Sequence, residues 1–189
     1  MTRTLTGLLT CVCLVPGVTP TPASSQQAHP GVYVAQGACP SESCTYGPWR
    51  VLRDTRLLAT SEDSAAPAGV VHAADTVQAL PGHVRSVPTA FLVKEGFRGT
   101  EGHAWAPGDT SWVLTYLGEG YFHIWADGKV QDEELGFSPY GGTFGTRCTG
   151  CRRGELVREL RSEWWIKIRA RNGATGWTRQ SDNFEAVGT

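Results

Sequence analysis

The feature that most constrains the fold is an alternation of residue types near the C-terminal end of the chain. From Trp164 to Arg171 the sequence reads WWIKIRAR, and the turn pair Asn172-Gly173 follows directly. Side chains of a β-strand point to opposite faces with a period of two. The two faces would carry Trp164, Ile166, Ile168 and Ala170 on one side and Trp165, Lys167, Arg169 and Arg171 on the other. We therefore predict a half-buried strand with Trp164 in the core, followed by a hairpin. Trp165 is expected on the outer face among cations, either as an accessible ligand platform or as a lid over the end of the domain or against a neighbouring unit.

The composition favours an all-β protein with long loops and little helix. The 189 residues include 23 glycines and 11 prolines, and 40% of the chain is hydrophobic, which is enough for a globular core. Asp127-Gly128 is a strong signal for a two-residue hairpin turn. Residues 75–88 alternate like a strand but contain Pro81-Gly82, which predicts a hairpin there. Trp177, after Gly176, is expected in the core.

The N-terminal residues resemble a secretory signal peptide. Arg3 precedes an apolar run from Leu5 to Val18, which is too short to span a bilayer as a stable helix. We expect cleavage between Ala23 and Gln27, and hence a secreted or periplasmic protein. A lipidated Cys11 is the alternative, although Thr10 stands where such signals carry Gly, Ala or Ser.

Charge is distributed unevenly along the chain. Removal of residues 1–25 leaves 16 basic and 18 acidic groups, so the net charge is −2 and indicates no particular partner. Residues 147–179 hold nine Lys or Arg against three Glu, whereas residues 119–134 hold five acids and one Lys. This asymmetry either steers an anionic partner to the C-terminal part or reflects two solvated faces of opposite charge.

Two local cysteine pairs remain after cleavage, Cys39 with Cys44 and Cys148 with Cys151. In an exported chain they are most simply disulfides, with local pairing favoured. Two alternatives stay open. Both pairs together have the ligand chemistry of a tetrahedral zinc site, and Cys148-Thr-Gly-Cys151 is a C-x-x-C motif whose arginine neighbours favour a reactive thiolate.

Residues 154–184 resemble the second half of a bacterial SH3-like domain. The shared pattern is a Gly-acidic start, a strand with Trp, aromatic, Lys and Arg positions, a glycine hairpin, and Gly-Trp before the last turn. A fainter copy lies upstream, where Tyr121–Trp125 and Trp165–Arg169 align with an offset of 44 as a tandem repeat would. The resemblance implies two small SH3-like barrels in tandem. The expected organisation is a signal peptide (1–25), an arm with a cysteine pair (26–47), a first unit (48–134), a linker with a cysteine pair (135–153) and part of a second unit (154–189).

The resemblance further implies a non-catalytic binding module of the bacterial cell envelope. Its partner would be a peptidoglycan-type wall polymer, a peptide or another envelope protein, with no nucleic acid, no cofactor and no membrane span in the mature chain. Trp165 stands where the ligand-facing aromatic would be, and Asn183-Phe184 matches the final Asn-aromatic pair. The candidate ligand-binding residues are Trp165, Lys167, Arg169, Arg171, Asn183 and Phe184.

Enzymatic alternatives have little support in the sequence. The five histidines show no metal-binding spacing, and no nucleophile elbow or phosphate-binding glycine loop is present. His103, close to Trp105 and Asp109, is the only local cluster suited to acid-base chemistry. Two other functions remain open: a structural or protein–protein accessory that buries the same aromatics, and a thiol-disulfide oxidoreductase acting through Cys148 and Cys151.

Overall fold

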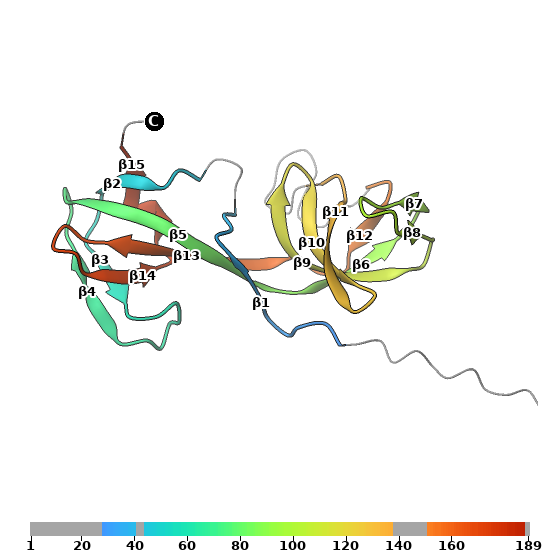
Figure 1. The fold of residues 1–189 in the computed structure, drawn as a ribbon, viewed down its shortest axis with the longest axis horizontal. Coiled ribbons are helices and arrows are strands. Elements are labelled where there is room, and N and C mark those ends of the chain that lie inside the picture. The colour runs from blue at the N-terminus through green and yellow to red at the C-terminus, as the bar shows by residue number, and fades with distance from the viewer. Residues whose placement is uncertain (1–27, 41–43, 138–150, 188–189) are drawn as a thin grey trace, which may run out of the picture.

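The described part of the computed structural model is built almost entirely from β-strands. It comprises residues 28–40, 44–137 and 151–187. Within these residues there are fifteen strands and one 3₁₀ turn, η1 (Ser181–Asn183), and no α-helix. The expected all-β class is confirmed. Figure 1 shows two groups of strands side by side, joined by the long strand β5.

The first group is an eight-stranded antiparallel sheet. Its strand order is β15-β2-β5-β13-β14-β3-β4, and β1 also pairs with β5. The strands are β1 (Tyr33–Gln36), β2 (Gly47–Val51), β3 (Thr55–Leu58), β4 (Pro67–Val71), β5 (Thr76–Val87), β13 (Arg161–Arg169), β14 (Thr175–Thr178) and β15 (Phe184–Ala186). The sheet is curled, and its concave side holds a core built around Trp49, Ile166, Ile168 and Phe184.

The second group is a five-stranded sheet with the order β11-β10-β9-β6-β12. Its strands are β6 (Thr89–Val93), β9 (Thr110–Gly118), β10 (Tyr121–Ala126), β11 (Lys129–Glu134) and β12 (Gly154–Leu156), and a small hairpin is formed by β7 (Phe97–Arg98) and β8 (Ala104–Trp105). A separate core lies here, built around Phe91, Phe122, Ile124 and Phe137. The predicted Asp127-Gly128 hairpin is confirmed, because β10 and β11 pair up to Ala126 and Lys129 and both turn residues have positive φ.

The strand pairing does not follow the expected unit boundaries of 48–134 and 154–189. The second sheet is inserted between β5 and β13 of the first, so the first sheet draws strands from both sides of the insertion. In particular, β13 pairs with β5 along its length and β14 pairs with β3. These contacts join segments that are far apart in sequence, which a search for local units cannot detect.

Pro81-Gly82 does not form the predicted hairpin. Strand β5 continues through both residues, which together face the single residue Ile166 of β13 as a β-bulge. A Cβ atom on Gly82 would lie 1.8 Å from the carbonyl oxygen of Trp165. The glycine therefore serves a close approach of two strands rather than a chain reversal.

Candidate functional site

The predicted binding residues lie in three places of the eight-stranded sheet, and none belongs to the inward set of β13. That set, Trp164, Ile166, Ile168 and Ala170, packs in or against the concave core, as the alternation predicted. Lys167 and Arg169 belong to the opposite, outer face of β13. The outer face carries a pocket beside Trp165 and a hollow beside Arg169, whereas Asn183 and Phe184 lie elsewhere.

Trp165 is buried, which agrees with its interpretation as a lid and not with that as an accessible platform. Only 1% of its surface is accessible, although it belongs to neither hydrophobic core cluster. The guanidinium carbon of Arg179 lies 5.2 Å from the centre of its ring. Arg179 follows Thr178, which pairs with Ile166, so its side chain extends over the neighbouring Trp165. Alternation gave the face correctly but could not show that another strand covers it.

Trp177 is the aromatic residue that remains accessible on the outer face. It is half-buried, pairs with Lys167 across β13 and β14, and is absent from the core to which the sequence assigned it. The preceding Gly176 faces inward, where an added Cβ would lie 2.6 Å from the Cβ of Leu57. Because Gly176 takes the inward position, Trp177 must point outward. This close approach was not visible in the sequence.

Lys167 and His83 flank the half-buried ring of Trp177. The ammonium nitrogen of Lys167 lies 5.6 Å from a Trp177 ring centroid, within the range of a cation–π contact. The His83 ring centroid lies 5.1 Å from that of Trp177. Burial, and secondarily the charge of Arg85, lowers the pKa of His83 below its ordinary value. The histidine therefore favours the neutral form beside the indole.

A pocket of about 210 Å³ lies between the two tryptophans Trp165 and Trp177 and residues of strand β3. Its lining includes Arg56, Leu58, Asp63, Trp165, Trp177 and Arg179. The walls thus combine two indole rings, one aliphatic side chain, two guanidinium groups and one carboxylate. Arg179, Trp177 and Asp63 were not among the predicted site residues, and only the closeness of Trp177 to the basic strand signalled their importance.

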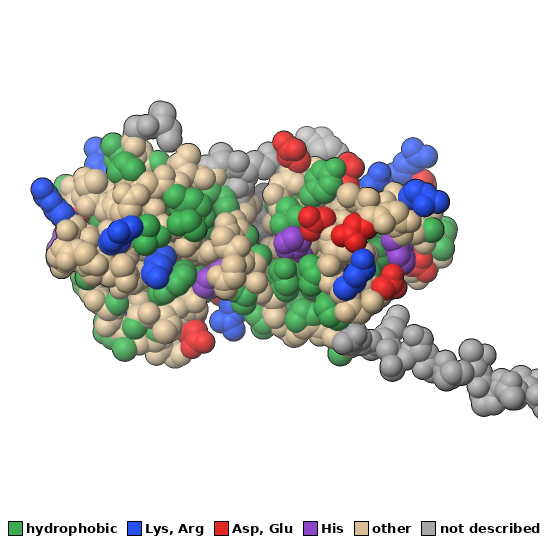
Figure 2. All heavy atoms as spheres, in the orientation of Figure 1, with side chains coloured by type: hydrophobic (Ala, Val, Ile, Leu, Met, Phe, Trp, Pro, Cys, Tyr) green, Lys and Arg blue, Asp and Glu red, His purple; other side chains and the backbone are tan. Residues whose placement is uncertain are grey.

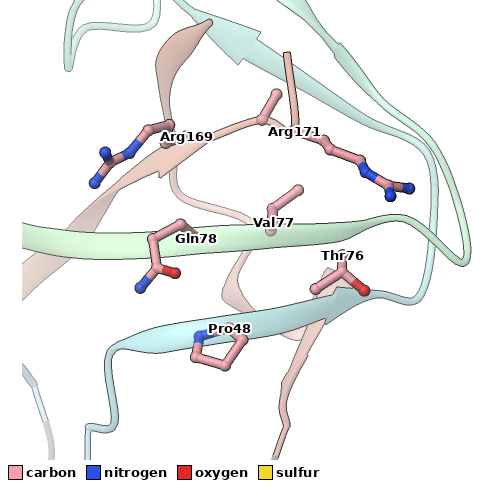
Figure 3. A pocket seen from close by; sticks show the side chains of 7 residues that line it. Pro48, Thr76, Val77, Gln78, Arg169 and Arg171 are labelled. Carbon is pink, nitrogen blue, oxygen red and sulfur yellow. The ribbon is translucent and has the colours of Figure 1, made fainter. Parts of the chain in front are cut away.

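Arg169 and Arg171 line a different hollow, of about 340 Å³, at the far end of the same strands (Figure 3). Pro48, Thr76 and Gln78 form the rest of its rim, and the two guanidinium groups point away from each other. Neither arginine has an acidic partner among the described residues. The predicted basic strand is therefore split between two openings of one sheet.

Asn183 and Phe184 have structural roles instead of lining either opening. The amide of Asn183 donates hydrogen bonds to the Thr55 hydroxyl and to the Gln180 side chain. Phe184 pairs with Val51 and is buried in the concave core, 5.8 Å from the ring of Trp49. Their assignment as ligand contacts is not supported by their positions, because both fasten the last strand to the sheet.

The cysteine prediction is confirmed for the first pair. Cys39 and Cys44 form a disulfide with a Cα–Cα distance of 6.1 Å. Their sulfurs are thus not available to a shared zinc site, and the described residues contain no group of three or more potential metal ligands. Cys151 is also disulfide-bonded. Cys148 lies outside the described residues, as do the predicted signal peptide and the cysteines within it.

The cluster around His103 is confirmed for Trp105, whose ring centroid lies 4.2 Å from that of the imidazole, but the acidic partner is not Asp109. The His103 imidazole lies 3.0 Å from Asp127, while Asp109 accepts a hydrogen bond from the backbone N–H of Ala106. The buried carboxylate nearby belongs to Glu133, which accepts hydrogen bonds from Trp105 and from Thr100. Because the Glu133 carboxylate is fully hydrogen-bonded by these donors, it stabilises the β7–β8 hairpin, and its role is structural.

The basic segment predicted from the sequence is divided between the two sheets, because Arg152, Arg153 and Arg158 flank β12 of the five-stranded sheet. In Figure 2, acidic side chains gather on the five-stranded sheet, and several basic side chains lie on the eight-stranded one. Three described cations of the five-stranded part form ion pairs: Lys94 with Glu155, Lys129 with Glu101 and Arg152 with Glu95. An anionic partner would thus meet its most favourable field at the eight-stranded sheet.

Comparisons with known proteins give no family to which the site can be assigned. The chain was compared with models of protein families, with curated proteins and with solved structures, and none of the three gave a match. Among the described residues, no helix has the length and apolar character needed to cross a membrane. The function must therefore be argued from the outer face itself.

Proposed function

We propose that this protein is an exported, non-catalytic binding module of the bacterial envelope that engages a peptidoglycan-type polymer or a peptide. The outer face of its eight-stranded sheet is the binding surface. The observation that carries this proposal is the contact between Lys167 and the accessible ring of Trp177 on a face with further cations. A flat aromatic ring beside unpaired cations suits a ligand with both apolar rings or side chains and negative charge.

The position of the cations supports an extended ligand. Arg169 lies two residues beyond Lys167 on the same face, and Arg171 lines the same hollow as Arg169. Successive residues of one face are about 6.6 Å apart along a strand, so Lys167 and Arg169 are spaced to contact neighbouring groups of one extended ligand. The SH3-like resemblance supports the proposal through the same two strands, since its Trp-x-Lys and Gly-Trp elements pair in register here.

Retention on insoluble wall material tests the proposal. We expect purified protein to be retained, and Trp177→Ala to weaken binding at least about tenfold, as loss of a central interface tryptophan does. Lys167→Gln should weaken it about two- to fivefold, the worth of an exposed cation–π contact. Arg152→Gln is the matched control, because that exposed arginine pairs with Glu95 on the other sheet. Equal retention of wild type and Trp177→Ala would reject the proposal, as would the absence of retention.

A structural or protein–protein accessory role is the second candidate, and the burial of Trp165 favours it. In that case the aromatics would stabilise the sheet without a small ligand. Trp177→Ala would then lower the thermal stability of the protein and leave retention on wall material unchanged. Measuring both quantities on the same variant separates the two candidates.

A further inference from the structure

We propose that the pocket beside Trp165 binds the C-terminal carboxylate of a peptide, and that Asp63 occupies the place of this carboxylate in the resting protein. The inference deepens the proposed function and rests on it, because it names a ligand group for the same face. Its basis is the environment of one arginine, Arg179, and of one unpaired N–H group.

Arg179 is held by two acidic residues of different origin. One terminal nitrogen lies 2.6 Å from Glu163, a residue of the adjacent strand β13. The other terminal nitrogen lies 2.6 Å from Asp63, which belongs to the loop between β3 and β4. An arginine fork matches the geometry of a carboxylate. The Asp63 side chain thus marks where a carboxylate binds this pocket.

Trp165 contributes a donor that has no partner. Its indole nitrogen is buried and makes no hydrogen bond, although the residue lines the pocket. A buried donor without an acceptor is unfavourable, and most such groups in proteins are paired. In the resting protein Arg179 lies over the ring of Trp165 and is held by Asp63, while the indole N–H has no acceptor.

The remaining walls define what accompanies the carboxylate. Arg56 adds a second guanidinium, which has no acidic partner among the described residues. Leu58 and Trp177 provide apolar surface within the same 210 Å³ volume, which has room for a small side chain. Two cations, one N–H donor and an apolar wall together suit a peptide that ends in a small apolar residue and a free carboxylate.

Asp63 is positioned to be displaced. Its side chain is 67% exposed, and it lies in a loop closed by the backbone hydrogen bond from Ala59 to Ala66. Removing it from Arg179 breaks a surface ion pair without disturbing the core, and such pairs contribute little to stability. The ligand carboxylate therefore competes with Asp63, whose ion pair with Arg179 is weak.

The test follows the indole N–H resonance of Trp165 by NMR in tryptophan-labelled protein, with Trp165→Phe identifying the signal. The probe is N-acetyl-alanyl-alanine, and its C-terminal amide and free alanine are the comparison ligands. We expect the acid to shift the Trp165 signal and the amide to leave it in place. Free alanine should bind more weakly than the dipeptide, because its ammonium group lies beside Arg56 and Arg179.

Three variants are expected to change the affinity for the probe in different ways. Asp63→Asn should tighten the probe about two- to fivefold, because it removes the competing carboxylate. Arg179→Gln should weaken it at least about tenfold, through loss of a charge-assisted hydrogen bond. Glu62→Gln, the exposed neighbour of Asp63, is the matched control and should leave the affinity unchanged.

Equal shifts with acid and amide, no shift with either, or weaker binding by Asp63→Asn would overturn the inference. Its failure is distinguishable from that of the proposed function. If the Trp165 signal stays in place while wall material still retains the protein through Trp177, only the carboxylate site is rejected. If the dipeptide acid binds but the protein is not retained on wall material, the carboxylate site stands and the polymer proposal fails.

Discussion

Trp105 donates its indole N–H to the carboxylate of Glu133 across 3.0 Å, and both side chains are buried. This bond joins the β7–β8 hairpin to β11 of the five-stranded sheet. Glu133 also accepts hydrogen bonds from the backbone and hydroxyl of Thr100. The short hairpin has no acceptors of its own for these N–H and O–H groups. Glu133 supplies the acceptor that water would otherwise provide.

Replacing Glu133 by alanine should destabilise the protein strongly. The change leaves the buried Trp105 N–H without an acceptor, which costs about 1–3 kcal/mol, and also removes the acceptor of the part-buried Thr100 N–H. We expect the free energy of unfolding in urea to fall by about 2–4 kcal/mol. Glu62→Gln, at an exposed position, should change it by less than about 0.5 kcal/mol. A loss at Glu133 as small as that of the control would show that the network is not stabilising.

Gly82→Ala should destabilise the bulge between β5 and β13. The new methyl group would lie 1.8 Å from the Trp165 carbonyl oxygen, so the strands must separate locally. We expect a loss of about 1–3 kcal/mol, as for other overpacked sites, measured by thermal or urea unfolding. Gly31→Ala serves as the control, because its added Cβ would meet no atom within 4 Å. Similar stability of the two variants would contradict the close approach.

His83 should make the stability depend on pH. Burial lowers the pKa of its imidazole, with a smaller effect from Arg85, so the unfolded chain binds the proton more readily than the folded protein. The free energy of unfolding should therefore fall as pH decreases below about 6.5, the ordinary histidine value, and level off below the folded-state pKa.

The contribution of His83 is isolated by comparison with His83→Gln. The difference between the two unfolding free energies, measured at intervals from pH 8 to pH 4, removes the contributions of all other titrating groups. The wild type should lose stability relative to the variant on acidification. A difference that is constant with pH, or that grows in favour of the wild type, would reject the assigned burial effect.

Fluorescence quenching by acrylamide should distinguish the two tryptophans of the outer face. Trp165 is 1% exposed, so Trp165→Phe should remove unquenchable emission and leave the quenchable fraction no lower than in the wild type. Trp177 is half-buried and lines the pocket, so Trp177→Phe should reduce that fraction. The opposite ranking would place the accessible ring at Trp165 and contradict this assignment.

The sequence determined the features that depend on neighbouring residues. The all-β class, the Asp127-Gly128 turn, the inward set that contains Ile166 and Ile168, and the local disulfide of Cys39 and Cys44 all follow from period, turn chemistry or short spacing. Each of these is decided within a few residues of chain. Side-chain direction along β13 was predictable for the same reason.

The tertiary structure alone decided what covers each face and which strands meet. Trp165 points outward as the alternation requires, yet Arg179 closes over it from the next strand. Trp177 is accessible because Gly176 packs closely against Leu57 of β3, a residue distant in sequence. Alternation fixes direction, whereas exposure depends on long-range packing, and for this reason Trp177 is the more accessible of the two tryptophans.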